Sequence, residues 1–183
     1  MLQINVEQIK ASGLSLNFRE NAQTFPVLAE MTKNEDLAFV EPIDIVLSII
    51  KVGGIIEISG KFTTTVRLAC ARCLENYETS LASEFELTYT RELPGRLEES
   101  LPDEKELTAA EMGLIYFEGE QISLQDGIQE RVVMALPLRP LCHDACQGLC
   151  PNCGTDLNHK RCACETGPST NQFAVLKDLK LDS

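Results

Sequence analysis

The chain has 183 residues, of which 44% are hydrophobic, and its formal net charge is −12. This length suits one sizeable domain that buries about 70% of its unfolded surface. The acidic balance disfavours general affinity for nucleic acid, which depends on basic side chains. The longest apolar stretch, residues 43–58, is broken by charged residues and glycines, and the N-terminus lacks a secretory signal. The sequence therefore predicts a soluble, cytoplasmic protein with no membrane partner.

A β-hairpin is predicted in the first half of the chain. From Ile56 to Leu68 the even positions are mostly apolar and the odd positions polar, which is the period of a half-buried strand. Residues 43–52 before it are rich in Ile, Val and Leu. Gly53-Gly54 supplies the positive φ angles that a tight hairpin turn needs. The N-terminal 40 residues are less informative, although residues 14–18 alternate and predict one further strand.

A second long strand is predicted after the first cysteine pair, because the alternation resumes there in odd phase. Cys70-Ala-Arg-Cys73 is therefore expected at the bend between two antiparallel strands. A bend held by a sheet is a rigid mount for half of a metal site. The apolar positions of this second strand are Tyr77, Leu81, Phe85, Leu87 and Tyr89.

The next segment predicts an acidic loop, a short strand and one main helix. Residues 91–111 hold two prolines, a glycine and six glutamates, a composition typical of a mobile excursion from a sheet. Residues 114–117 predict a short strand. Ser123-x-x-Asp126 resembles a capping box at the start of a helix over about 124–136. Its apolar positions recur every four residues, at Leu124, Ile128, Val132 and Leu136.

The cysteines predict one metal site and suggest a second. Cys150-Pro-Asn-Cys153-Gly is typical of a zinc knuckle, in which two thiolates hold one ion and proline and glycine set the bend. Cys162-x-Cys164 would complete a tetrahedral four-sulfur site. The four remaining cysteines form a second candidate set whose two halves are separated by 68 residues. This set comprises Cys70, Cys73, Cys142 and Cys146.

Other interpretations of the cysteines stay open at this point. They include a reactive thiol pair, an iron–sulfur cluster, and His143 or His159 as replacement ligands. The spacing from Cys146 to Cys153 also matches the cluster motif of radical S-adenosylmethionine enzymes, but those place it early in a long β/α barrel. Closed four-sulfur sites suit structure rather than catalysis. Since motifs for nucleophilic, phosphate-binding or metalloprotease chemistry are absent, we expect no enzyme activity and no small-molecule substrate.

Charge is distributed unevenly along the chain. Residues 84–130 hold 13 acidic and 3 basic side chains, so this segment is a candidate contact for a basic protein. Four basic residues near the cysteines are candidate contacts for RNA or another partner, namely Arg67, Arg72, Lys160 and Arg161. The alternative is that they offset the negative charge of the thiolates.

Several motifs occur together along the chain. They are Cys70-Ala-Arg-Cys73-Leu74, the helix ending Ala135-Leu-Pro137, the run Cys146–Asn158, Cys162-Ala-Cys164 and the closing Asn171–Lys177. In order and spacing these motifs resemble the YceD family, whose members are described as large ribosomal RNA subunit accumulation proteins. The resemblance covers most of the chain from about residue 43. It implies a cytoplasmic, non-enzymatic factor that supports accumulation of 23S ribosomal RNA during large-subunit assembly.

The expected fold is α+β: an antiparallel β-sheet or partly open barrel with one main helix and a Cys-rich zinc-knuckle C-terminal region. Residues 1–141 are expected to form the β-rich domain, with residues 142–183 as a metal-binding region and tail packed on it. The favoured partner is a ribosomal protein or large-subunit assembly intermediate, with 23S rRNA as the other possibility. The second candidate function is a metal- or redox-sensing regulatory protein that uses its cysteine pairs.

Overall fold

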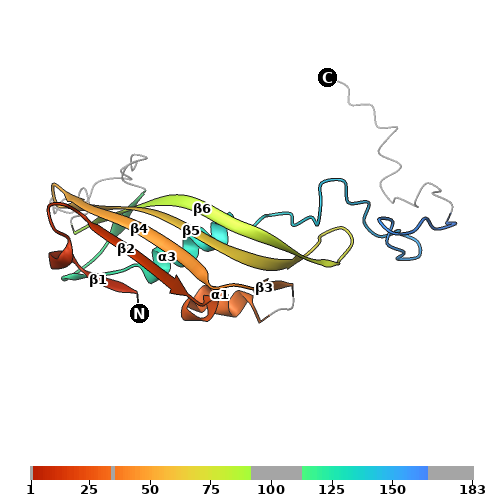
Figure 1. Cartoon of the computed structure of the whole chain (residues 1–183), viewed down its shortest axis with the longest axis horizontal. Coiled ribbons are helices and arrows are strands. Elements are labelled where there is room, and N and C mark those ends of the chain that lie inside the picture. Colours follow the sequence, from red (N-terminus) through yellow and green to blue (C-terminus); the bar gives the residue numbers. More distant parts are fainter. Residues whose placement is uncertain (1, 34–35, 92–112, 165–183) are drawn as a thin grey trace, which may run out of the picture.

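A computed structural model describes residues 2–33, 36–91 and 113–164 of the chain. The main sheet is organised around a long antiparallel hairpin of β5 (Ile55–Ala69) and β6 (Asn76–Thr90). The cysteine-rich segment lies at one end of the molecule, past the turn that joins these two strands (Figure 1). The hairpin therefore joins the hydrophobic core at one end to the candidate metal region at the other.

Three strands pair on one side of the hairpin. β4 (Ile43–Val52) is antiparallel to the first part of β5, and β2 (Leu14–Glu20) is antiparallel to β4. β3 (Leu37–Phe39) pairs with the later part of β5, beyond the reach of β4. The turn between β4 and β5 is Gly53-Gly54, with φ angles of +56° and +89°. The positive φ angles confirm the hairpin predicted from the glycine pair.

On the other side, β7 (Leu114–Tyr116) pairs parallel to β6. The sheet is thus mixed rather than wholly antiparallel. Its described strand order, β2-β4-β5-β6-β7, is that of an open sheet and not of a closed barrel. A separate two-stranded sheet joins β1 (Gln3–Asn5) to β8 (Gln121–Ser123).

One face of the main sheet forms the core. The even positions of β5 and the odd positions of β4 are buried, as the alternation predicts. Burial of each such Ile or Phe side chain stabilises the folded state by roughly 1.5–3 kcal/mol relative to leaving it exposed. Gly60 breaks the apolar series because the Phe85 ring occupies its side-chain space: a Cβ at Gly60 would lie 2.2 Å from Phe85 Cζ. The core therefore depends on this glycine–aromatic pair across β5 and β6.

The main helix, α3 (Gln125–Ala135), packs on β6 and confirms the helix predicted over about 124–136. The close approach of α3 to β6 requires a glycine at position 127, because a Cβ there would lie 2.7 Å from Leu87 Cδ1. The predicted capping box is wrong, since the N-cap residue is Leu124 and no side chain caps the helix. The Asp126 carboxylate instead accepts a hydrogen bond from Gln129 Nε2 at 2.9 Å.

Short elements occupy the N-terminal residues on either side of β2, where the sequence shows no hydrophobic periodicity. They are the 3₁₀ turns Val6–Gln8 and Ala22–Thr24 and the one-and-a-half-turn helix α1 (Pro26–Met31). Phe25 and Leu28 are fully buried there, so this segment closes one side of the core. Most of the predicted acidic loop, residues 92–111, lies outside the described residues.

Candidate metal centre

The first half-site is the bend between β5 and β6. The Cys70 N–H donates to the Glu75 carbonyl at 2.9 Å, and the Leu74 N–H donates to the Cys70 carbonyl at 2.9 Å. These two bonds close a tight loop around Cys70 and Cys73 immediately beyond the last strand pair, Ala69↔Asn76. Leu74 adopts a φ of +62°, which is the left-handed region that favours glycine.

The knuckle at Cys150 repeats this backbone pattern. The Cys150 N–H donates to the Thr155 carbonyl at 2.8 Å, and the Gly154 N–H donates to the Cys150 carbonyl at 2.9 Å. Gly154 has a φ of +72° and takes the position that Leu74 takes in the first bend. The chain therefore contains two knuckles of the same hydrogen-bond geometry, one held by a sheet and one held by loops.

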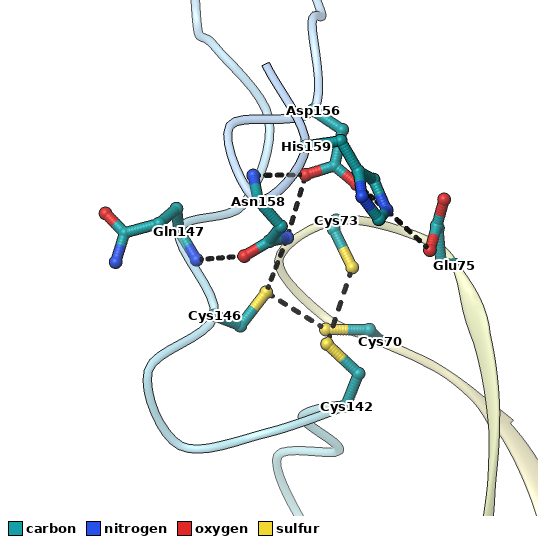
Figure 2. Close-up of polar contacts among 9 residues, drawn as sticks. All are labelled: Cys70, Cys73, Glu75, Cys142, Cys146, Gln147, Asp156, Asn158 and His159. Carbon is teal, nitrogen blue, oxygen red and sulfur yellow. Dashed lines mark hydrogen bonds and ion pairs between the residues drawn. The ribbon is translucent and has the colours of Figure 1, made fainter. Parts of the chain in front are cut away.

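The first cluster brings together Cys70, Cys73, Cys142 and Cys146, although the two halves are far apart in sequence (Figure 2). All four Sγ atoms lie within 4.8 Å of one another. Cys70 Sγ is 3.8 Å from Cys146 Sγ, and Cys73 Sγ is 3.7 Å from Cys142 Sγ. A tetrahedron with metal–sulfur bonds of about 2.3 Å has edges of about 3.8 Å, so the sulfurs are spaced for one ion.

Main-chain contacts hold the two halves of this cluster together. The Ala71 N–H donates to the Pro140 carbonyl at 2.8 Å, just before Cys142. Arg72, between the first two cysteines, donates from Nη1 to the Cys146 carbonyl at 2.7 Å. Cys70, Cys73 and Cys146 are buried, with Tyr77, Leu141 and Leu149 packed around them. The cluster thus lies in a small apolar shell, and Tyr77 packs against both this shell and the main core.

The second cluster contains Cys150, Cys153, Cys162 and Cys164, whose sulfurs also lie within 4.8 Å of one another. It is less enclosed than the first, because Cys153 is exposed while Cys162 and Cys164 are half-buried. Thr155 Oγ1 lies 3.2 Å from Cys153 Sγ. Each of the two clusters could hold a metal ion.

Each cluster mixes cysteines of low and high proton affinity. Burial raises the pKa of Cys70, but backbone N–H groups, foremost that of Cys73, stabilise its thiolate and bring the pKa to about 6. Burial, followed by the neighbouring thiols, raises the pKa of Cys142 to about 12. The hydroxyl and the N–H of Thr155 lower the pKa of Cys153 to about 6, whereas Cys153 raises that of Cys164 to about 12. In each cluster, a metal ion that binds four thiolates must therefore displace protons from the cysteines of high pKa.

Neither histidine is part of a cysteine cluster. His143 is exposed. His159 Nε2 lies 3.6 Å from a Glu75 carboxylate oxygen and 3.7 Å from Asp156 Oδ2 (Figure 2). This group joins the first bend to the loop of the second knuckle, so His159 lies between the clusters rather than replacing a cysteine in one of them.

The four basic candidates lie in different surroundings. Arg67 donates to Glu78 Oε1 at 2.7 Å across β5 and β6, and Arg72 donates to the Cys146 carbonyl. Lys160 and Arg161 are exposed, and their side chains make no hydrogen bond or ion pair within the described residues. The role of all four in partner binding stays a prediction.

One residue close to the first cluster had no sequence signal of its own. Asn158 Nδ2 lies 3.4 Å from Cys146 Sγ and 2.8 Å from Asp156 Oδ1. An asparagine 12 residues beyond a cysteine follows no ligand spacing, and only the folding back of the second knuckle brings it to that sulfur. The sequence placed Asn158 inside the cysteine-rich run without indicating this contact.

Fold and site together define an α+β protein whose long hairpin carries one four-cysteine cluster at its bend and a second beside it. Among the described residues, no helix is long and apolar enough to cross a membrane. The family model described as large ribosomal RNA subunit accumulation protein YceD matches residues 58–180, and the chain belongs to this family.

A curated relative supports the same assignment. The chain is 23% identical over 202 residues to "Large ribosomal RNA subunit accumulation protein YCED homolog 1, chloroplastic" of Arabidopsis thaliana. This match covers 98% of the chain but 57% of the relative, so the chain spans little more than half of that protein's length. No solved structure matches the chain.

Proposed function

We propose that this protein is a cytoplasmic, non-enzymatic factor that supports accumulation of 23S ribosomal RNA during large-subunit assembly, with zinc as a structural metal. The observation that carries the proposal is membership of the YceD family over residues 58–180. The two closed four-cysteine clusters add a physical argument against catalysis, because four protein ligands leave no open position for a substrate.

Zinc is the metal that the donor set fits best. Four thiolates in tetrahedral arrangement are typical of structural zinc or of iron–sulfur centres. The sulfur–sulfur distances of 3.7 and 3.8 Å match the edge of a single-ion site, and the knuckle turns direct backbone N–H groups towards the sulfurs. The expected stoichiometry is therefore two zinc ions per chain.

The charges favour a basic protein or an assembly intermediate over naked RNA as the direct partner. Two of the four basic candidates already have partners within the chain: Arg67 pairs with Glu78, and Arg72 donates to the Cys146 carbonyl. That leaves Lys160 and Arg161 as exposed cations close to the clusters. Two cations provide little of the counterion release on which RNA affinity depends.

A redox- or metal-sensing role is the second candidate function. It is favoured by the exposure of Cys153, since solvent-accessible cysteines in electropositive or hydrogen-bonded surroundings are the ones that react. A sensor would lose metal and form disulfides under mild oxidant. A structural centre would keep its zinc content under the same treatment.

The assembly role is tested by removing the protein from its own cells and measuring the ratio of large- to small-subunit rRNA. We expect this ratio to fall and to be restored by the wild-type protein but not by Cys70→Ser with Cys73→Ser. A matched control is His143→Ala, an exposed change in the cysteine-rich region at a residue that belongs to neither cluster, and it should restore the ratio. An unchanged rRNA ratio in cells without the protein would contradict the assembly role.

A further inference from the structure

We propose that the two cysteine clusters load metal as a coupled pair, and that Asn158 is the residue through which the second knuckle positions a ligand of the first centre. This inference rests on the proposed metal binding and goes beyond it. The coupling follows from three links between the clusters, of which the first is covalent and the other two are sets of contacts.

The first is the shortness of the segment that the clusters share. Cys146 belongs to the first cluster and Cys150 to the second, with only three residues between them. The covalent connection between the two centres is therefore short, so the positions of Cys146 and Cys150 depend on one another.

The second set anchors this shared segment on the first knuckle. The Leu149 N–H donates to the Arg72 carbonyl at 3.2 Å, while the Arg72 guanidinium donates to the Cys146 carbonyl. Gly148 has a φ of +71°, and a Cβ there would lie 3.1 Å from the Arg72 carbonyl oxygen. The segment between the clusters thus packs directly against the loop that carries Cys70 and Cys73.

The third set holds the loop that follows the second knuckle beside the first centre, and Figure 2 shows Asp156 and Asn158 of this loop next to Cys146. Leu149 and Asp156 form an antiparallel bridge, and the Leu157 N–H donates to the Gly148 carbonyl at 2.9 Å. This places Asn158 beside Gln147, whose N–H donates to Asn158 Oδ1 at 2.7 Å. Because Oδ1 is committed to that N–H, the amide nitrogen is the atom that faces Cys146 Sγ at 3.4 Å.

An N–H directed at a thiolate lowers the free energy of the charged sulfur and fixes the direction in which it points to the metal. Asn158 can do this only when the loop after Cys153 is ordered, and a metal in the second cluster orders that loop. A first metal therefore reduces the entropy that the second must remove, which gives positive cooperativity without a change of fold. By linkage, the effect is reciprocal between the two centres.

The test uses the full chain, purified without metal under reducing conditions and titrated with Co²⁺ and then Zn²⁺. Native mass spectrometry at half loading should show mainly empty and doubly loaded wild-type chains. Asn158→Ala keeps all eight cysteines. We expect it to lower the affinity for one of the two metal ions by about 10-fold or more, so that singly loaded chains become populated. It should also shift the sulfur-to-cobalt charge-transfer band, which a merely structural role would not do.

Two comparisons make the result specific. Lys160→Ala, an exposed change in the same loop, should leave affinity and spectrum as in the wild type. With Cys162→Ser and Cys164→Ser in place, the remaining centre should bind more weakly, and adding Asn158→Ala should then cost little more.

The possible failures are distinguishable. A wild-type chain that binds neither ion would contradict the proposed metal centres themselves. Two metals bound in independent steps, with Asn158→Ala identical to the wild type, would overturn the coupling alone. Circular dichroism of each variant checks that the sheet has formed, so that weakened metal binding in a folded chain supports the proposal and unaltered binding rejects it.

Discussion

Leu74 and Gly154 occupy equivalent positions in the two knuckles. Both follow the second cysteine of a knuckle, both donate to the carbonyl of the first cysteine, and both have φ angles near the left-handed region. For glycine this conformation is accessible without steric cost, whereas for leucine it costs about 1–2 kcal/mol. The sheet that holds the first bend sustains this strain, and Leu74 is 67% exposed.

Opposite substitutions at these two positions should change stability in opposite directions. Leu74→Gly removes the left-handed strain and adds some unfolded-state entropy, so we expect a net gain of roughly 0.5 kcal/mol in the free energy of unfolding. Gly154→Ala introduces the strain where no neighbouring atom would obstruct a Cβ, so we expect a loss of about 1 kcal/mol. Thermal unfolding of the metal-loaded proteins measures both changes. A lower midpoint for Leu74→Gly would show that the leucine side chain itself stabilises the bend.

At the scale of elements, the β5–β6 hairpin and the knuckles depend on different forces. The hairpin is stabilised by a continuous ladder from Ile55↔Thr90 to Ala69↔Asn76 and by the buried face that α3 covers. Residues 142–164, the described part of the cysteine-rich region, contain no helix or strand of the main fold and share a small apolar cluster with the first bend. Without a metal, little burial would remain to order that region.

Loss of the second cluster should therefore loosen the cysteine-rich region and leave the sheet intact. We expect Cys150→Ser with Cys153→Ser to abolish exchange protection in residues 142–164 while the amides of β5 and β6 stay protected. Hydrogen exchange read by mass spectrometry distinguishes the two regions, and zinc content should fall in parallel. Uniform loss of protection along the chain would mean that the two regions unfold as one cooperative unit.

Most of the elements that the sequence predicted have long, clear periods, and the exception is the short strand predicted over residues 114–117, which is β7. The alternations in β5 and β6 extend over most of each strand, so strand positions and buried faces follow from residue type. β3 and α1 escaped prediction because three and six residues carry no usable period. The parallel pairing of β7 depends on a non-local choice of neighbour, which local sequence does not encode.

The candidate site was predictable to a similar extent. The pairs Cys70/Cys73 and Cys150/Cys153 are recognisable because two ligands of one ion must lie a few residues apart. The structure also places the half-sites in the two sets that spacing suggested. Contacts around the sulfurs were not predictable, because Arg72 and Asn158 reach Cys146 through the tertiary fold.

For the whole molecule, the distribution of charge determines which partner is favoured. The segment from residue 84 to residue 130 has 13 acidic and 3 basic residues, whereas the cysteine-rich end presents Lys160 and Arg161 to solvent. At about 0.15 M salt the Debye length is about 8 Å, so only charges in close contact with a partner act on it. A basic protein surface would complement the acidic segment, and a phosphate backbone would be repelled by it.

We therefore expect the metal-loaded protein to bind a basic ribosomal protein or an assembly intermediate at least 10-fold more tightly than isolated 23S RNA fragments. Neutralising Glu98, Glu99, Asp103 and Glu104 to their amides, all outside the described residues, should weaken that binding. By contrast, Arg67→Glu should matter less, since Arg67 is already paired with Glu78. Titrations of the protein with each of these partners at several salt concentrations measure the two affinities. Tight RNA capture that declines steeply with salt and is lost on Lys160→Gln with Arg161→Gln would establish RNA as the direct partner, because those cations would then be the ones that neutralise phosphates.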